Sequence, residues 1–209
     1  MRFGRNPMTT RCVRLYRVLL ILCAVAVLFP ATAAAQFTAV DLGTLGGGFS
    51  WAHAVNNRGQ VVGRSATASG AHHAFIWEAG VMRDLGTLPG GSYSEALSIN
   101  DGGQVVGWGS IDEATCALLW TDGTVRDLGF LPGGIWSFAR DINNAGRVVG
   151  ESLIPSTGYR AFVWEDGVMS ELPMRPRAES YARGINGRGD IVGAYDSGNG
   201  IHAILWTKR

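Results

Sequence analysis

Residues 84–110 read DLGTLPGGSYSEALSINDGGQVVGWGS, and this stretch decides the fold because its pattern returns three more times. Residues 41–65 read DLGTLGGGFSWAHAVNNRGQVVGRS, and residues 127–152 read DLGFLPGGIWSFARDINNAGRVVGES. A more diverged copy, ELPMRPRAESYARGINGRGDIVGAY, covers residues 171–195. The chain is therefore a repeat protein with four copies of one unit.

Two independent markers give the same period. One tryptophan recurs every 42 to 44 residues and one glycine every 43 or 44, at Trp77, Trp120, Trp164 and Trp206 and at Gly63, Gly107, Gly150 and Gly193. Units of about 40–50 residues are typical of β-propeller blades. Glycines interrupt each unit every few residues, which excludes the long amphipathic helices of helical repeats.

Each unit is predicted to contain two hairpins. In the second unit we expect strands over 95–99, 104–108, 117–120 and 124–128. The first and second strands are joined by a turn with Asn first and Gly fourth, and the third and fourth by a shorter turn that also carries Gly. The tryptophan before the second turn is expected to pack in the core between neighbouring units.

The two ends of the repeat region complement each other. Residues 37–42 resemble a fourth strand, and the last unit lacks its own fourth strand after Trp206. Pairing of Phe37–Leu42 with the last unit would close an all-β propeller of four four-stranded blades and remove the open sheet edges. The alternative is a partial ring, which a second copy of the chain would complete as a homodimer.

The N-terminus has the features of a secretory signal peptide. Five arginines and no acidic residue precede the apolar run 18–29, which is followed by the small-residue sequence ATAAAQ. This pattern predicts cleavage before Gln36, with the start codon at Met1 or Met8, and an extracellular or periplasmic protein that keeps no membrane segment. Residues 1–35 would be the signal peptide and 36–209 the propeller domain.

Charge and cysteine content narrow the function classes. Removal of residues 1–35 takes five basic residues from the totals of 18 basic and 17 acidic, which leaves a net charge of about −4. A chain of this charge has no electrostatic basis for binding nucleic acid. Cys116 would be the one remaining cysteine, so no intrachain disulfide is expected, and it stands where other copies have His73, Arg160 and His202.

Three repeated blocks together resemble a known repeat. These blocks are D-L-G-x-L-x-G-G, A-x-x-I-N-x-x-G-x-V-V-G and H-A-F-x-W-x-x-G, the last one present as residues 73–80. In this order they resemble the HAF repeat of bacterial exported proteins, over Phe37 to Arg209. The resemblance implies an extracellular location and a β-propeller, and it supplies no catalytic residue set. The fourth copy departs from the pattern with ELPMRPRA, and Cys116 and Arg160 replace the histidine.

A ligand site is expected on the face that carries the variable connections between the second and third strands. Phe49, Tyr93, Trp136 and Glu179 stand at one position of this face, seven residues before each turn asparagine. They would form an aromatic cup for a glycan or a protein side chain, or they would wedge between blades. We expect no cofactor, no metal site and no catalytic residue.

Three readings of the function follow. The first is a binding module for surface interactions, and the second is a purely structural repeat. The third is an extracellular polysaccharide hydrolase or lyase, for which Asp112, Glu113 and Glu179 would be the acids to test.

Overall fold

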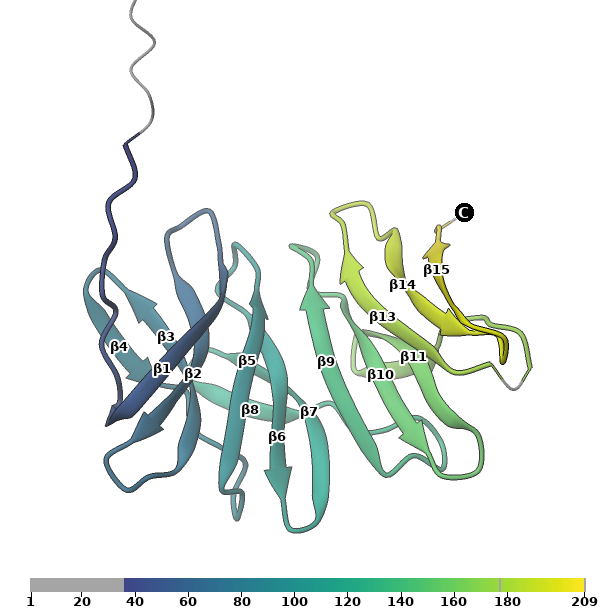
Figure 1. Ribbon diagram of the computed structural model, residues 1–209, viewed down its shortest axis with the longest axis horizontal. Coiled ribbons are helices and arrows are strands. Elements are labelled where there is room, and N and C mark those ends of the chain that lie inside the picture. The colour runs from purple at the N-terminus through teal and green to yellow at the C-terminus, as the bar shows by residue number, and fades with distance from the viewer. Residues whose placement is uncertain (1–35, 177, 209) are drawn as a thin grey trace, which may run out of the picture. The chain divides into compact units, whose positions relative to one another are not determined.

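The computed structural model describes residues 36–176 and 178–208 (Figure 1). The described residues contain fifteen strands and no helix, so the prediction of an all-β protein is confirmed. No helix long and apolar enough to cross a membrane occurs among them. All strands belong to the compact unit Asp41–Arg209, and the predicted signal peptide lies outside the described residues.

The strands follow the four sequence units in order. The first unit contains β1 (Gly46–Val55), β2 (Val61–Thr67), β3 (His72–Glu78) and β4 (Val81–Asp84). The second contains β5 (Tyr93–Ile99), β6 (Val105–Ile111), β7 (Ala114–Thr121) and β8 (Thr124–Asp127). The third contains β9 (Trp136–Ile142), β10 (Val148–Ile154), β11 (Gly158–Glu165) and β12 (Val168–Glu171). The fourth contains β13 (Ser180–Ile185), β14 (Ile191–Asp196) and β15 (Ile201–Trp206).

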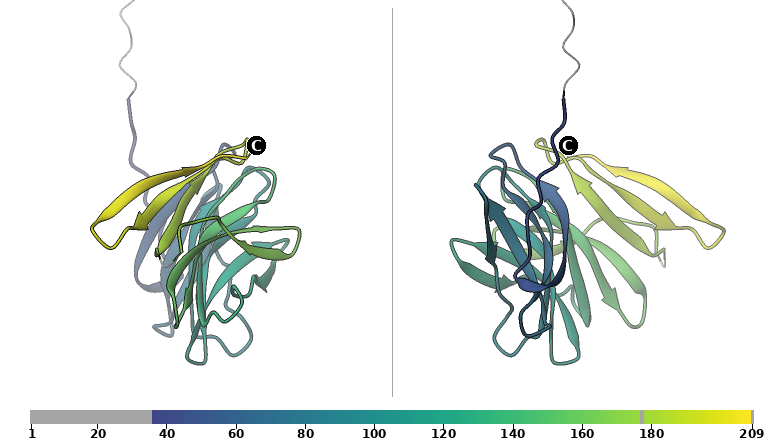
Figure 2. Two further views of the ribbon diagram at one scale, coloured as in Figure 1. Left: turned by 90° about the vertical axis from the view of Figure 1, so that its right-hand side faces the viewer. Right: turned by 60° about the vertical axis from the view of Figure 1, so that its left-hand side comes forward.

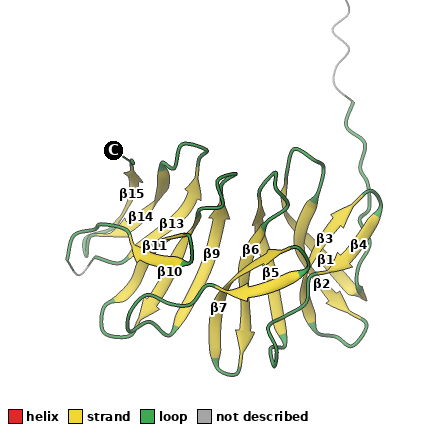
Figure 3. Ribbon diagram, turned by 180° about the vertical axis from the view of Figure 1, so that it is seen from behind, coloured by secondary structure: helices red, strands yellow, loops and turns green. Residues whose placement is uncertain are grey.

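Within each unit, consecutive strands pair antiparallel, which confirms the two-hairpin prediction. Neighbouring units are joined by single parallel bridges, His72 to Tyr93 and Thr115 to Trp136. The first three units thereby form one twelve-stranded sheet, and β13–β15 form a separate three-stranded sheet. Figure 3 shows the units side by side, built from strands and connecting loops alone.

The two predicted turns have the expected geometry. In the second unit, Gly103 N–H donates to the Asn100 carbonyl at 3.0 Å, and the Asn100 side chain accepts from Gln104 N–H at 3.0 Å. Gly103 has φ +83°, a conformation that glycine adopts without steric cost. The second turn places Asp122 and Gly123 at φ 51° and 75°, the type I′ geometry that suits a two-residue hairpin.

A β-bulge explains the glycine that marks the repeat. The pairing of β5 with β6 shifts register between Ala96 and Ser98, and the other first strands shift at the same place. The shift brings the Glu95 carbonyl oxygen against Gly107, where a Cβ atom would overlap it. Gly63, Gly150 and Gly193 meet the corresponding carbonyls in their own units. Each unit therefore requires glycine at this position.

The hydrophobic core is divided among the junctions between units. One cluster joins Val62 and Ile76 of the first unit to Ile99 and Trp120 of the second. A second cluster joins units two and three around Trp164, and a third joins units three and four around Trp206. The prediction that these tryptophans pack between units is confirmed for Trp120, Trp164 and Trp206, whereas Trp77 is half-buried.

The predicted closing strand is absent from this structure. Residues 36–44 form no strand, so closure by a strand over Phe37–Leu42 is not confirmed, and β15 pairs only with β14 among the described strands. The physical reason is that an isolated strand has no partner for its backbone groups. The variable connections between second and third strands are short, because hairpin pairing extends into them: only Asp112 and Glu113 connect β6 to β7. Figure 2 shows the fourth unit, β13–β15, leading away from the twelve-stranded sheet.

Candidate binding site

The first strands of consecutive units, β1, β5, β9 and β13, lie next to one another, and their side chains take part in a polar cluster that spans the four units. Residues two apart on a strand share a face. At the two positions that flank the repeated serine, units one and three carry aromatic pairs and units two and four carry a tyrosine with a glutamate. The pairs are Phe49 with Trp51, Tyr93 with Glu95, Trp136 with Phe138, and Glu179 with Tyr181.

The two tyrosine–glutamate pairs are hydrogen-bonded although their order is reversed. Tyr93 donates its hydroxyl hydrogen to Glu95 Oε2 at 2.8 Å, and Tyr181 donates to Glu179 Oε2 at 2.5 Å. Burial and these contacts raise the pKa of both phenols. Unit four therefore keeps the tyrosine–glutamate pair of unit two, with the two positions exchanged.

Contacts run without a break across all four units. They link eleven side chains, which we call the inner-strand cluster: Trp51, Arg64, Tyr93, Glu95, Trp108, Phe138, Arg140, Glu151, Glu179, Tyr181 and Arg183. Tyr93 stacks on Trp108 with ring centroids 4.7 Å apart, and Trp108 meets Phe138 edge-on at 5.6 Å. Three arginines lie over aromatic rings of the first strands: Arg64 over Trp51, Arg140 over Phe138 and Arg183 over Tyr181. Each ring belongs to the residue directly after the repeated serine.

Buried carboxylates anchor the arginines. Glu95 Oε1 lies 2.8 Å from His53 Nε2, and Glu95 Oε2 lies 3.5 Å from Arg64 Nη1. Glu151, which is only 2% exposed, accepts from Arg140 Nη2 at 2.5 Å and from Arg183 Nη1 at 3.2 Å. Three guanidinium groups and three carboxylates balance in the cluster, so it presents little net charge to a ligand.

Two buried polar atoms of this cluster have no hydrogen-bond partner among residues 36–176 and 178–208: the Arg64 Nε donor and the Glu151 Oε2 acceptor. The Tyr93 hydroxyl raises the pKa of Arg64, so the guanidinium stays charged. Unpartnered donors and acceptors beside flat aromatic faces can bind a polar group that brings its own donors and acceptors. Arg183, whose side chain is half exposed, keeps the cluster in contact with solvent.

Two of the four predicted site residues, Tyr93 and Glu179, belong to this cluster. The Phe49 ring meets the His72 ring edge-on at 4.8 Å, and the Tyr93 ring lies 5.9 Å from the same histidine. Trp136 is 37% exposed and makes no aromatic contact with either of them in the part of the chain that the structure describes. The structure thus brings Phe49 and Tyr93 together around His72, and Tyr93 and Glu179 belong to the cluster.

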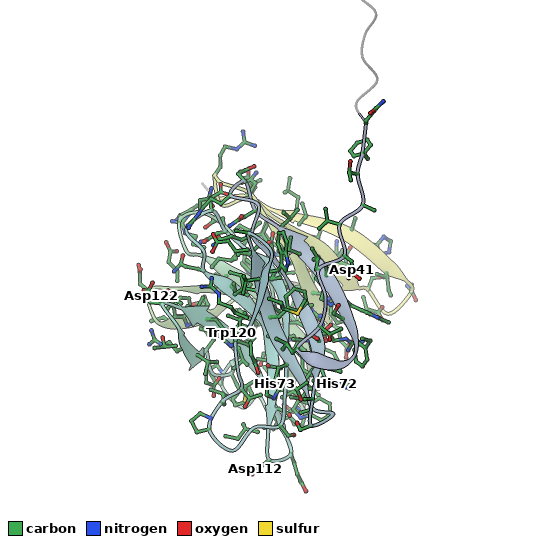
Figure 4. The ribbon with its side chains drawn as sticks, turned by 90° about the vertical axis from the view of Figure 1, so that its left-hand side faces the viewer. Asp41, His72, His73, Asp112, Trp120 and Asp122 are labelled. Carbon is green, nitrogen blue, oxygen red and sulfur yellow. The ribbon has the colours of Figure 1, made fainter. Side chains whose placement is uncertain are left out.

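The acids proposed for a hydrolase occupy unrelated places. Asp112 and Glu113 are exposed at the tip of the β6–β7 hairpin, where Asp112 has φ 50° (Figure 4). Glu179 is half-buried and bonded to Tyr181. Among residues 36–176 and 178–208, no three His, Cys, Asp or Glu side chains come together as metal ligands.

Sequence reasoning missed the second-strand members of the cluster. Arg64, Trp108 and Glu151 directly follow the repeated Val-Val-Gly, and the fourth unit has Ala194 there. A large, variable side chain next to a constant block was the available signal. This signal does not identify the partners, because the register that pairs these residues with Trp51, Glu95 and Phe138 is not evident from a single sequence.

A second concave region lies at the opposite end of the first strands, where the Asn-containing turns meet. The cavity has a volume of about 270 Å³ and is lined by these turns from all four units, including Asn57, Asp101 and Asn144. Asp101 Oδ2 accepts from the side-chain amides of Asn57 and Asn144, each at 2.9 Å. These hydrogen bonds lower the pKa of the Asp101 carboxyl. The turns of neighbouring units are therefore tied to each other by side chains.

Comparison with known proteins supports the fold. No protein-family model and no curated protein matches the sequence. Among solved structures, the chain is similar to acylaminoacyl peptidase of Pyrococcus horikoshii, with TM-score 0.51 and 13% identity over 76% of this chain and 26% of that one. It is also similar to the β-propeller domain of the trilobed protease from Pyrococcus furiosus, described as having an open velcro topology, with TM-score 0.51 and 11% identity over 77% of this chain and 53% of that one. The chain spans well under two thirds of either structure, and the likeness supports a β-propeller fold.

Proposed function

We propose that this chain is an exported four-bladed β-propeller that acts as a binding module and takes a neutral sugar residue at the inner-strand cluster. The observation that carries the proposal is the cluster itself. Aromatic faces from β1, β6, β9 and β13 are interleaved with arginines and carboxylates whose charges balance. A purely structural junction would be served by apolar packing, because buried ion pairs contribute little net stability.

The ligand class follows from the chemistry of the cluster. The flat face of a pyranose stacks on an indole or phenol ring, and its hydroxyls both donate and accept hydrogen bonds. Balanced charge gives no advantage to a polyanion or a polycation. The half-exposed guanidinium of Arg183 is a donor for hydroxyl groups. Phe49, Tyr93, Trp136 and Glu179 would form the rim of this site.

Binding to a glycan array tests this function. We expect the purified chain to bind neutral glycans and Trp51→Ala to lose at least about tenfold in affinity, since truncation of an aromatic hot-spot residue costs about 2 kcal/mol or more. Trp51 is 57% exposed, so its removal leaves the fold intact. Val168→Ala is the matched control, because Val168 is 62% exposed on β12, outside the cluster. Absence of binding on glycan and protein arrays would favour a structural repeat instead.

The proposed export and repeat family rest on the sequence. The Arg-rich start, the apolar run and the ATAAAQ sequence support cleavage before Gln36. The three repeated blocks support membership of the HAF repeat family. Intact mass and N-terminal sequencing of protein recovered outside the cytoplasm should give a chain that begins at Gln36, whereas recovery of a chain that begins at Met1 or Met8 would contradict export with cleavage.

A further inference from the structure

We infer that the outer face of unit four is a docking surface for unit one of the same chain, and that docking places Asp41 opposite His202 on β15. This inference rests on the proposal of a four-bladed ring, and it assigns the residues that close the ring. Four independent features of the structure point to the same pairing.

The first feature is a pair of apolar faces that have counterparts in every formed junction. Val62, Val106 and Val149 stand at one repeat position and are fully buried, but Val192 at this position is 51% exposed. Leu205 is 59% exposed, whereas its counterparts Ile76 and Leu119 are buried. A hollow of about 410 Å³ is lined by Val192 and Leu205. The face of unit four therefore has the residues of a junction core without its partner.

Unit one carries the complementary half. Val55 is 66% exposed, whereas Ile99 and Ile142, its counterparts in the next two units, are 7% and 5% exposed and belong to junction cores. Val55 lies on β1, which has no preceding unit beside it in the sheet order of the described strands. Closing unit four onto unit one would give Val55 the burial that its counterparts have.

The second feature is a half-formed hydrogen-bond motif. In each formed junction a serine of the following unit accepts from an alanine N–H on the third strand: Ala74 to Ser94 at 2.9 Å, Ala117 to Ser137 at 2.8 Å and Ala161 to Ser180 at 2.9 Å. Ser94 and Ser137 also donate to the carbonyls of Gly86 and Gly129. Ser50 makes this second bond, to Gly43 O at 2.6 Å. The repeat assigns Ala203 N–H on β15 as its donor.

The third feature is the acid that ends each fourth strand. Asp84 Oδ2 lies 2.8 Å from His73 Nδ1, and Glu171 Oε1 lies 3.4 Å from Arg160 Nε. Residues 38–41, TAVD, match the fourth strands VMRD, TVRD and VMSE, which places Asp41 opposite His202. Docking of unit one on unit four would thus give His202 the acidic partner that its counterpart His73 has in Asp84.

The fourth feature is a directional relay of asparagines. Asn56 Nδ2 donates to Asn100 O at 3.0 Å, Asn100 Nδ2 donates to Asn143 O at 3.1 Å, and Asn143 Nδ2 donates to Asn186 O at 3.1 Å. Every donor lies one unit before its acceptor. The same rule assigns Asn56 O to Asn186 Nδ2. Asn186 Nδ2 already makes the within-turn bond, to Asp190 Oδ2 at 2.9 Å, that Asn56 and Asn100 make to Oε1 of Gln60 and Gln104 at 2.7 Å beside their bonds to the next unit.

The two surfaces differ from one another, so they either join within one chain or join copies head to tail. Attachment to the same repeat body gives the two faces an effective concentration in the millimolar range. At micromolar protein concentration, intramolecular closure is therefore favoured over association of two copies.

Amide hydrogen exchange by NMR tests closure without reference to any ligand, so its outcome is separate from that of glycan binding. In a closed ring, the Ala203 amide exchanges as slowly as those of Ala74, Ala117 and Ala161, at least about a hundredfold more slowly than an open strand edge. Ser50→Ala should abolish this protection and leave the Ala117 amide protected. Exchange of Ala203 at the rate of an open edge would overturn the inference.

A charge introduced at the docking surface gives a second readout. Val192→Asp buries a carboxylate only if the ring closes, and we expect its Tm to fall by about 10 °C or more. Val168→Asp, on an exposed position outside any junction, should shift Tm by no more than about 2 °C. Equal shifts in the two variants would count against closure. Protection of Ala203 that grows with protein concentration, together with a dimer mass in light scattering, would refute closure within one chain.

Discussion

Ser94→Ala removes one hydroxyl that ties two units together, and its cost can be worked out from the structure. The buried Ser94 Oγ accepts from Ala74 N–H at 2.9 Å and donates to Gly86 O at 2.7 Å. The substitution leaves both backbone groups without a partner. Each unpaired buried group costs about 1–3 kcal/mol, so for two groups we expect a loss of about 2–6 kcal/mol in the free energy of unfolding.

Urea denaturation followed by tryptophan fluorescence measures this loss at constant m-value. Ser137→Ala should lose as much as Ser94→Ala, because Ser137 makes the same two bonds at 2.8 Å each. Ser92→Ala is the control, since Ser92 is exposed two residues earlier and should change stability by less than about 0.5 kcal/mol. A value for Ser94→Ala within 0.5 kcal/mol of wild type would refute the view that these hydroxyls hold the junctions.

Three further perturbations address other parts of the fold. Gly107→Ala should lose more than about 3 kcal/mol in urea denaturation, because its Cβ would overlap the Glu95 carbonyl oxygen, whereas Gly48→Ala, with open space around it, should not. Burial raises the pKa of the Cys116 thiol to about 11. Native protein at pH 8 should therefore react with iodoacetamide at least about a hundredfold more slowly than urea-unfolded protein. Equal rates would contradict the burial of Cys116. The hydrogen bonds that lower the pKa of Asp101 stabilise the folded state above the ordinary aspartate pKa, and this stability is lost as pH falls through the lowered pKa. Asp101→Asn should therefore flatten the acid limb of the pH–stability curve, whereas Asp122→Asn should not.

Most of the fold could be predicted from the sequence, because the four copies of the unit carry the same turn and core residues at the same positions. Asn and Gly at fixed turn positions, and a tryptophan before each second hairpin turn, define the strands independently of tertiary context. The expected strand 117–120 is observed as β7, extended to Ala114–Thr121, since pairing continues as far as the hairpin allows. Closure could not be settled in this way, because it depends on residues 37–42 meeting a distant edge.

The candidate site was predictable only in part. Tyr93 and Glu179 stand out as members of a repeated position, and the structure places both in the inner-strand cluster. Glu151 and Arg64 could not be assigned to the site from the sequence, because their ion-pair partners lie on other strands. Glu95, the partner of Arg64, also lies in another unit. Ion pairs between units are set by the packing of blades, which a single sequence does not specify.

The central claim is that the four units form a closed ring, and methyl nuclear Overhauser contacts between its ends test this most directly. Closure predicts contacts from the Val55 methyl groups to those of Val192 and Leu205 in a monomeric sample, since all three would share one junction core. The matched contacts between Val62 and Ile99, which share a core in the structure, serve as the positive control. Control contacts without any contact from Val55 to Val192 or Leu205 would contradict the claim.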